Sequence, residues 1–271
     1  MVQAGQRMDR RGFLVGAGIA GVAAGLGLGL GGSASARSTL PVRDFGDVGA
    51  VAQLALDRNV VPGCAMIVGG PEGVIHQEVR GLADEAGSAL RGDHLYRIYS
   101  MTKPVTSALA LILMEAGVLD LEQPVSAWLP EFAAVRVYQS GDTLQTLQTA
   151  PLERAVTVRD LLRHTAGLTY RGADTPVARL YAWRGIDNGS GETITAMDGS
   201  PDPTTLAQFA AKIATIPLRE QPGTRFTYGN ATDVLGAVIE AATGTRLGSL
   251  MHDRIFLPLG MMDTAFTAVD P

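Results

Sequence analysis

The residues best suited to chemistry in this sequence are a serine and a lysine three positions apart, Ser100 and Lys103. A serine hydroxyl is a poor nucleophile until a neighbouring base takes its proton, and a lysine can act as that base where burial lowers its pKa. Lys103 is one of only two lysines in the chain, the other being Lys212. The spacing alone fits a helix-capping serine beside an exposed lysine equally well, so the pair needs support from its surroundings.

Pro104 provides that support, because a proline inside a helix is tolerated only in the first turn. The helix that contains the apolar run Val105–Val118 is therefore predicted to begin at or near Ser100, and to be buried on most sides. Residues three apart share a helix face, so Lys103 should lie beside Ser100 Oγ. A serine at a helix start can also offer its own N–H to a developing oxyanion.

A second candidate group is Tyr228-Gly229-Asn230, which follows the turn Pro222-Gly223. Gly229 permits a close backbone approach, and residues two apart in an extended segment point the same way. A tyrosine oxygen near a lysine can hold or relay a proton, and an asparagine amide can bind a lysine or a substrate carbonyl. Taken alone, Tyr228 fits a packing residue and Asn230 fits a cap for the next helix.

Hydrophobic periodicity and turn residues predict the elements that carry these groups. A helix over 44–58 precedes a β-hairpin with strands at 63–68 and 74–80. Thr157–Asp160 reads as a capping box that opens a helix ended by Gly167. The segment 173–203 is rich in Gly, Asp and Thr and is predicted to be a loop. Further helices are predicted at 206–216, 232–242, where Gly244 ends the helix, and 247–256.

The first 36 residues are predicted to be a twin-arginine signal peptide. Arg10 and Arg11 precede an uncharged run rich in Gly, Ala and Leu, and Ala34-Ser35-Ala36 fits a cleavage site. The alternative is an uncleaved membrane anchor. Export by this route predicts a periplasmic or secreted protein with no stable membrane partner after cleavage.

Composition excludes several function classes. The 271 residues are 46% hydrophobic and carry a net charge of −5, without a basic stripe, which argues against nucleic acid as a partner. Cys64 is the only cysteine, so no internal disulfide can form, and its apolar neighbours predict a buried thiol. The four histidines are far apart in the sequence and are expected to be structural or exposed. No metal and no cofactor is predicted.

Taken together, these motifs resemble serine β-lactamases and penicillin-recognising enzymes. The neighbouring blocks are similar to the class C-like branch, which includes carboxylesterases of the family VIII type, D-amino-acid peptidases and amide hydrolases. The resemblance spans Val61 to Pro271 and is carried by four blocks in order: Ile98–Pro124, Thr157–Tyr170, Pro222–Gly244 and Leu257–Thr264.

The resemblance implies an α/β (α+β) fold, with an antiparallel sheet flanked by helices beside a helical domain and the active site between them. It implies that Ser100 is acylated, that Lys103 and Tyr228 share general acid and base work, and that Asn230 positions Lys103 and substrate. The family's third element, a Lys/His-x-Gly strand, does not occur after Asn230. We therefore expect an incomplete sheet, and expect residues 37–271 alone to be unstable and essentially inactive.

The implied organisation is a signal peptide over 1–36, the first part of the α/β domain with the nucleophile helix over 37–120, and a mostly helical domain over 121–271. The implied function is a serine hydrolase that forms an acyl-enzyme from small carboxylic esters, with amides and β-lactams also open. The alternative is a non-catalytic relative that binds peptidoglycan or another ligand, or an inactive fragment. The sequence does not indicate an oligomeric state.

Overall fold

The computed structural model describes residues 45–143, 145–186 and 196–267. The contacts divide the chain into two units. The first holds the described residues up to Tyr96 together with Leu259–Asp263, and the second holds Arg97–Pro258 and residues 264–267. The division falls just before the predicted nucleophile helix. The predicted boundaries at 36 and 120 stay predictions, and the predicted signal peptide lies outside the described residues.

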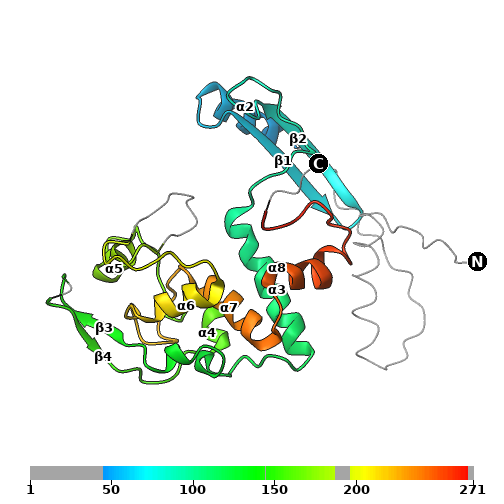
Figure 1. Cartoon of the computed structure of the whole chain (residues 1–271). Coiled ribbons are helices and arrows are strands. Elements are labelled where there is room, and N and C mark those ends of the chain that lie inside the picture. Colours follow the sequence, from blue (N-terminus) through cyan, green and yellow to red (C-terminus); the bar gives the residue numbers. More distant parts are fainter. Residues whose placement is uncertain (1–44, 144, 187–195, 268–271) are drawn as a thin grey trace, which may run out of the picture. The chain divides into compact units, whose positions relative to one another are not determined.

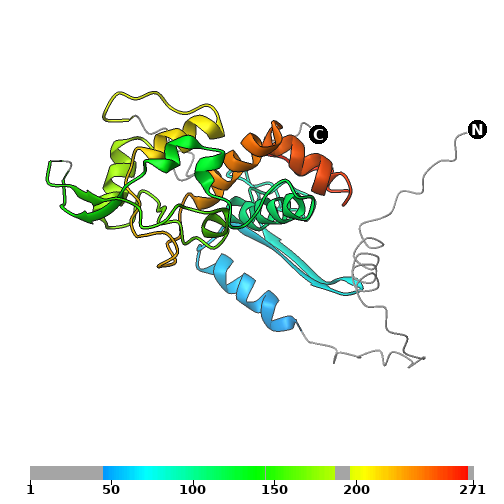
Figure 2. The same ribbon diagram turned by 90° about the horizontal axis from the view of Figure 1, so that it is seen from below.

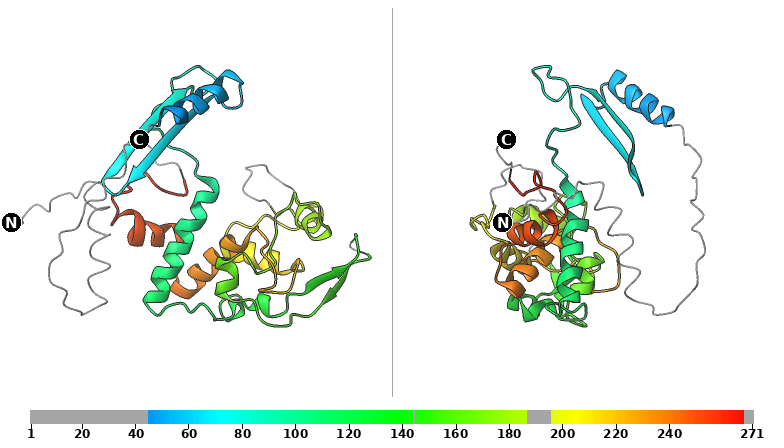
Figure 3. Two further views of the ribbon diagram at one scale, coloured as in Figure 1. Left: turned by 180° about the vertical axis from the view of Figure 1, so that it is seen from behind. Right: turned by 90° about the vertical axis from the view of Figure 1, so that its right-hand side faces the viewer.

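The first unit contains the predicted helix and hairpin. Helix α2 (Gly46–Asp57) packs against strand β2 (Gly73–Gly81), which pairs antiparallel with β1 (Gly63–Gly70) (Figure 3). Gly73 has φ 114°, a conformation that only glycine adopts readily, and it closes the turn between the strands. Cys64 on β1 is only half-buried, so the expectation of a buried thiol is not met within this two-stranded sheet.

Helix α7 (Ala231–Thr243) is the centre of the second unit. It packs against α3 (Thr102–Glu115), α4 (Val158–Leu162), α6 (Leu206–Ala214) and α8 (Leu247–Met251), as Figure 1 shows. Its apolar side chains between Ala231 and Ile239 are buried, and Gly244 ends it, as predicted, in a left-handed conformation. A π-helical turn, His252–Phe256, continues α8. The helices predicted at 206–216, 232–242 and 247–256 are therefore confirmed. The helix that opens at Thr157–Asp160 is shorter than predicted: α4 ends at Leu162 and not at Gly167, because His164 already takes a left-handed backbone with φ 54°.

The nucleophile helix α3 follows a 3-10 turn over Tyr99–Met101, so the predicted start near Ser100 is confirmed. Its predicted burial on most sides is wrong for the described residues. One face is buried, formed by Thr106, Leu109, Ala110 and Leu113, whereas Leu111 is 44% exposed. An apolar run allows a helix to be buried on all sides, but the elements packed against the helix determine how much of its surface is buried. No helix among the described residues is long and apolar enough to cross a membrane.

Two elements depart from the sequence-based prediction. Helix α5 (Pro176–Trp183) lies inside the segment 173–203 that was expected to be a loop, with Thr175 as its N-cap and a proline in its first turn. A second antiparallel hairpin, β3 (Val137–Ser140) and β4 (Gln148–Ala150), extends from the helices at the left of Figures 1 and 2. Its strands are too short for an alternating pattern to stand out in the sequence.

The capping box at the start of α4 is present as predicted. Thr157 Oγ1 accepts from the Asp160 backbone N–H, and the Asp160 carboxylate accepts from the Thr157 N–H. Asp160 is only 3% exposed and also binds the Arg154 guanidinium through both oxygens, at 2.6 and 2.8 Å, and the Thr165 hydroxyl at 3.0 Å. This carboxylate thereby ties the end of α4 to the loop that leads to the candidate site.

Candidate active site

Ser100 and Lys103 meet at the start of α3. Lys103 Nζ lies 3.3 Å from Ser100 Oγ, as the three-residue spacing predicts. The preceding residue, Tyr99, has φ 41°, a left-handed backbone that is uncommon for a residue with a side chain. Because Ser100 lies in the first helical turn, its N–H belongs to the group that a helix start leaves without an intrahelical partner. The same residue thus offers a nucleophilic oxygen and an anion-binding N–H.

Tyr228 reaches the same oxygen from a distant loop. Its phenol donates a hydrogen bond to Ser100 Oγ at 2.7 Å, across 128 residues of sequence. The loop that carries it is paired with the segment after α4, through hydrogen bonds from Arg219 N, Gly223 N and Thr227 N to the carbonyls of Gly167, Thr165 and His164. Ser100 Oγ is therefore in contact with both Lys103 and Tyr228.

Gly229 explains how this loop comes so close to its neighbour. A Cβ at this position would lie 2.5 Å from Cα and from the carbonyl carbon of Thr169, well inside van der Waals contact. Only glycine fits there, which confirms the close approach predicted from the sequence.

Asn230 is 2% exposed and occupies the N-cap position of α7 without a side-chain cap bond. Its Nδ2 instead donates to the Thr169 carbonyl at 3.0 Å. Among the described residues, no hydrogen bond joins Asn230 to Lys103, so in this structure the amide fixes the loop beside the site. The expected role of Asn230 in holding Lys103 and substrate stays a prediction.

The pKa values of Lys103 and Tyr228 do not follow from burial alone. Burial lowers the pKa of Lys103, as expected, but hydrogen bonds and charge interactions with Tyr170 and Tyr228 outweigh it, so the pKa is raised. The pKa of Tyr228 is lowered, first by its hydrogen bond with Ser100 and then by Lys103. Lys103 is therefore held as an ammonium, and Tyr228 is the group that loses its proton more readily. The expectation that Lys103 and Tyr228 share the acid and base work stays a prediction, and the two pKa directions favour Tyr228 as the proton acceptor.

Three further residues of the site were not singled out from the sequence. Tyr170 packs edge-on against Tyr228, with ring centroids 5.5 Å apart, and Lys103 Nζ lies 5.7 and 5.0 Å from the centroids of these two rings. Asp233, in the first turn of α7, has its pKa raised by burial despite the charge of Lys103. His164, expected to be structural or exposed, stacks on Tyr228 at 4.9 Å. The one sequence signal that could have indicated these residues is their position inside two of the four blocks of the resemblance, Thr157–Tyr170 and Pro222–Gly244.

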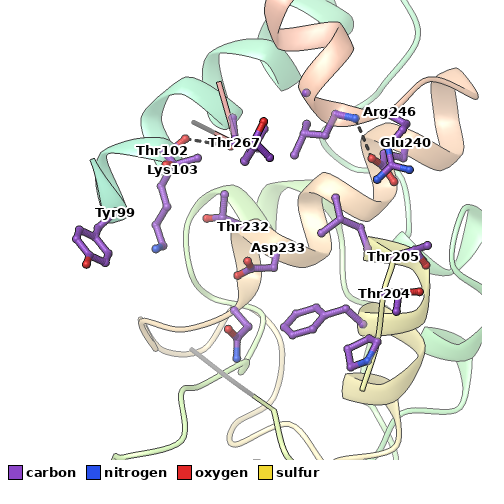
Figure 4. Close-up of a pocket in the computed structure, with 18 of the residues that line it drawn as sticks. Tyr99, Thr102, Lys103, Thr204, Thr205, Thr232, Asp233, Glu240, Arg246 and Thr267 are labelled. Atoms are coloured by element: carbon purple, nitrogen blue, oxygen red, sulfur yellow. Dashed lines mark hydrogen bonds between the residues drawn. The ribbon is translucent and has the colours of Figure 1, made fainter. Parts of the chain in front are cut away.

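A cavity of about 990 Å³ adjoins Ser100 in the second unit. The side chains of Lys103, from α3, and Asp233, from α7, point into it (Figure 4). Its wall combines the apolar side chains of Leu206, Phe209 and Leu247 with hydroxyl groups, the amide of Asn230 and several charged side chains. Among the described residues, no group of three or more His, Cys, Asp or Glu could hold a metal ion. The arrangement can activate a serine oxygen and accommodate an organic group beside it.

Comparison with known proteins places these features in a family. The Beta-lactamase family profile matches residues 48–271. Esterase EstB of Burkholderia gladioli is 35% identical over 226 residues, which cover 82% of this chain and 51% of EstB. Lovastatin esterase of Penicillium rubens is 30% identical over 222 residues, which cover 80% of this chain and 52% of that protein. The chain spans about half the length of the curated relatives it matches.

Solved structures agree with this placement. EstCE1, described as a hydrolase with promiscuous acyltransferase activity, superposes with a TM-score of 0.66 and 30% sequence identity over 82% of this chain and 53% of EstCE1. The predicted β-lactamase-like fold of mixed helices and antiparallel strands is thereby confirmed, as is the resemblance to the esterase-containing branch. The chain belongs to the Beta-lactamase family.

Proposed function

We propose that the protein is a serine hydrolase that forms an acyl-enzyme at Ser100 from carboxylic esters. The observation that carries the proposal is the double contact at one oxygen. Ser100 Oγ lies 2.7 Å from the Tyr228 phenol and 3.3 Å from Lys103 Nζ. Both distances fall in or near the range needed for direct proton transfer. This constellation provides a nucleophile, a base and a fixed positive charge.

In the acylation step, Tyr228 acts as phenolate and takes the Ser100 hydroxyl proton, while the Lys103 ammonium stabilises the phenolate. Ser100 Oγ attacks the ester carbon, and the carbonyl electrons move to oxygen, beside the Ser100 N–H. When this intermediate collapses, the bond to the alcohol oxygen breaks. The leaving alkoxide then takes the proton from Tyr228 and departs as a neutral alcohol.

Deacylation repeats the sequence with water. Tyr228 takes a proton from a water molecule, the resulting hydroxide attacks the acyl carbon, and Ser100 leaves as the alkoxide that recovers the proton. The net reaction is ester and water to carboxylic acid and alcohol. Lys103 keeps its proton throughout, which is consistent with its raised pKa.

Esters are the favoured substrate class. Two relatives at 30% identity or more carry the name esterase, and the cavity beside Ser100 presents the apolar side chains of Leu206, Phe209 and Leu247 to a substrate. Amides and β-lactams form the same acyl-serine and are part of the proposal as poorer substrates.

A second candidate function is acyl transfer to an alcohol. Tyr228 is 43% exposed and Ser100 also faces solvent, so an acceptor larger than water can reach the acyl-enzyme. The two activities differ in the acceptor alone. A purified sample given p-nitrophenyl butyrate with and without an added alcohol separates them, because transfer yields a new ester where hydrolysis yields butyric acid.

The acyl-serine is tested by labelling the purified protein with a fluorophosphonate or a penicillin probe and mapping the modified peptide by mass spectrometry. We expect one adduct at Ser100, lost in Ser100→Ala and retained in the control Ser107→Ala, which changes another serine of α3. Adducts that persist in Ser100→Ala would remove Ser100 as nucleophile. Tight, reversible binding of a penicillin without any adduct would instead favour the non-catalytic binding relative.

Export is a separate part of the proposal. We propose that residues 1–36 direct the folded protein through the twin-arginine route, so that it acts in the periplasm or outside the cell. The support is the pair Arg10-Arg11 before an uncharged run and an Ala-Ser-Ala end. Changing both arginines to lysine should keep the precursor in the cytoplasm, as measured by cell fractionation. Unchanged export would rule out this route.

A further inference from the structure

His164 combines a left-handed backbone with a partly buried side chain in the candidate active site. Its φ is 54°, a region in which histidine, asparagine and aspartate are enriched among residues with a side chain. The conformation is fixed on both sides, since Thr165 N donates to the Asp160 carbonyl at 2.8 Å and the His164 carbonyl accepts from Thr227 N at 2.7 Å. Thr227 immediately precedes Tyr228, so the His164 backbone fixes the residue that carries the phenol into place.

The ring of His164 supports the same tyrosine. It stacks on Tyr228 with centroids 4.9 Å apart and planes tilted by 36°, and it meets Phe226 edge-on at 5.7 Å. Tyr228 is therefore contacted by the rings of both His164 and Tyr170. A phenol attached to an exposed loop gains a fixed position from such neighbours, because its ring otherwise has freedom about two side-chain bonds.

The ring is held without charge. His164 Nδ1 is buried and, among the described residues, has no hydrogen-bond partner. The groups that face this region are Lys103 on α3, Tyr170, Tyr228 and, at the start of α7, Asp233. Burial and the positive charge of Lys103 both lower the pKa of His164. A protonated ring would place a second positive charge beside Lys103 without a partner for its buried N–H.

We propose that His164 is a positioning residue whose neutral ring and backbone carbonyl hold the Tyr228 phenol within hydrogen-bond reach of Ser100. The inference rests on the proposed function, in which Tyr228 moves the Ser100 proton. His164 itself does not touch the reacting atoms. It keeps the phenol oxygen 2.7 Å from Ser100 Oγ through two contacts with the loop, the hydrogen bond from Thr227 N to its carbonyl and the ring contact with Tyr228.

Two substitutions separate the ring from the backbone conformation. His164→Asn tolerates φ 54° but removes the ring, whereas His164→Phe keeps an aromatic ring that cannot be protonated. His252→Asn is the control, because His252 lies in the π-helical turn after α8 and pairs with Asp253. For each variant, kcat and KM for p-nitrophenyl butyrate are measured per active site titrated with a fluorophosphonate, so that loss of folded protein does not count as loss of rate.

We expect His164→Asn to lose about a hundredfold in kcat with KM changed less than about threefold, because small displacements of a catalytic group have effects of this size. The acid limb of its kcat/KM profile should move to higher pH, because the hydrogen bond with Ser100 is the largest cause that lowers the pKa of Tyr228. His164→Phe should recover most of the rate and the wild-type limb. His252→Asn should behave as wild type.

Wild-type kcat and an unmoved limb in His164→Asn would overturn the inference, and so would equal losses in the Asn and Phe variants. A second readout does not need turnover. The pKa of Tyr228 is measured from a titration of tyrosinate absorbance. The curve of the same protein carrying Tyr228→Phe is subtracted, so that only the absorbance of Tyr228 remains. This pKa should be higher in His164→Asn than in wild type. If the wild type hydrolyses no ester but this difference is found, the proposed function fails and the positioning role stands.

Discussion

The Tyr228 phenol donates to Ser100 Oγ at 2.7 Å, although 128 residues separate the two in the chain. The contact is made by one loop, which is paired with the segment after α4 and is held close to it at Gly229. Lys103, only three residues after Ser100, completes the group from the same helix start. The chemistry proposed for this protein therefore depends on how one short helix start meets one distant loop.

Removing the phenol oxygen should abolish most turnover. Tyr228→Phe keeps the ring contacts with His164 and Tyr170 but removes the group that takes the Ser100 proton. We expect kcat for p-nitrophenyl butyrate to fall by about a hundredfold to ten-thousandfold with little change in KM. Tyr138→Phe, on β3, is the matched control and should retain wild-type kinetics. A Tyr228→Phe variant with near-normal kcat would mean that another group carries the proton.

Removing the positive charge should change the pH dependence. Lys103 lowers the pKa of Tyr228, so Lys103→Met raises it towards its ordinary value of 10. Because Tyr228 accepts a proton only as phenolate, a higher pKa means that less of it is active at a given pH, and the acid limb of kcat/KM should move to higher pH. Lys212→Met, which changes the only other lysine of the chain, should leave the limb in place.

Lys103→Arg tests whether charge alone is sufficient. Arg keeps the positive charge, but its planar guanidinium cannot occupy the position of a compact ammonium between Ser100 and two tyrosine rings. We expect a smaller shift of the acid limb than in Lys103→Met, together with a loss of about a hundredfold in kcat. Full activity in Lys103→Arg would show that the position of the charge matters little.

Local signals in the sequence were sufficient for the start of the nucleophile helix and for the hairpin of the first unit. Pro104 restricts where the helix can begin, and Gly69–Gly73 restricts where the strands can turn, whatever the rest of the chain does. The N-cap and proline at Thr175-Pro176 were local signals too. They were outweighed by the many Gly, Asp and Thr residues of 173–203, so helix α5 was missed.

The electrostatic state of Lys103 could not be predicted in this way. Its pKa depends on two tyrosines that follow it by 67 and 125 residues, and on how far each ring lies from Nζ. From the sequence alone, only the burial of Lys103 could be expected, and burial lowers its pKa. The interactions with Tyr170 and Tyr228 reverse the direction of the shift, so that the pKa is raised. The surroundings of Tyr170, His164 and Asp233 likewise follow from tertiary packing around α7 and not from any local pattern.

Adding one methyl group at Gly229 should disrupt the site without changing any chemical group. The new Cβ of Gly229→Ala would lie 2.5 Å from Thr169 backbone atoms, so the loop must move away and take Tyr228 with it. We expect a loss of about 1–3 kcal/mol in the free energy of unfolding, together with a fall in kcat. Gly69→Ala is the control, since its Cβ would meet nothing within 4 Å. A variant with unchanged melting temperature and kcat would show that the close approach is not needed.

Asp160 should stabilise the second unit in a pH-dependent way. Burial raises its pKa, but hydrogen bonds from Arg154, Thr157 and Thr165 outweigh this, and the net pKa lies below the ordinary 3.8. A lowered pKa contributes stability above the unfolded value of about 3.9, and this stability is lost as the pH falls through the folded value. We therefore expect Asp160→Asn to lose about 1–3 kcal/mol at pH 7, measured by urea unfolding, and the difference from wild type to shrink below pH 4.

The control for this comparison is Asp142→Asn. The Asp142 side chain is 86% exposed and lies 3.8 Å from Arg179, so its removal should change the free energy of unfolding by less than about 0.5 kcal/mol at either pH. The two variants carry the same change of charge, which removes net charge as an explanation for any difference between them. If Asp160→Asn is as stable as Asp142→Asn at pH 7, then the Arg154 pair does not stabilise the loop.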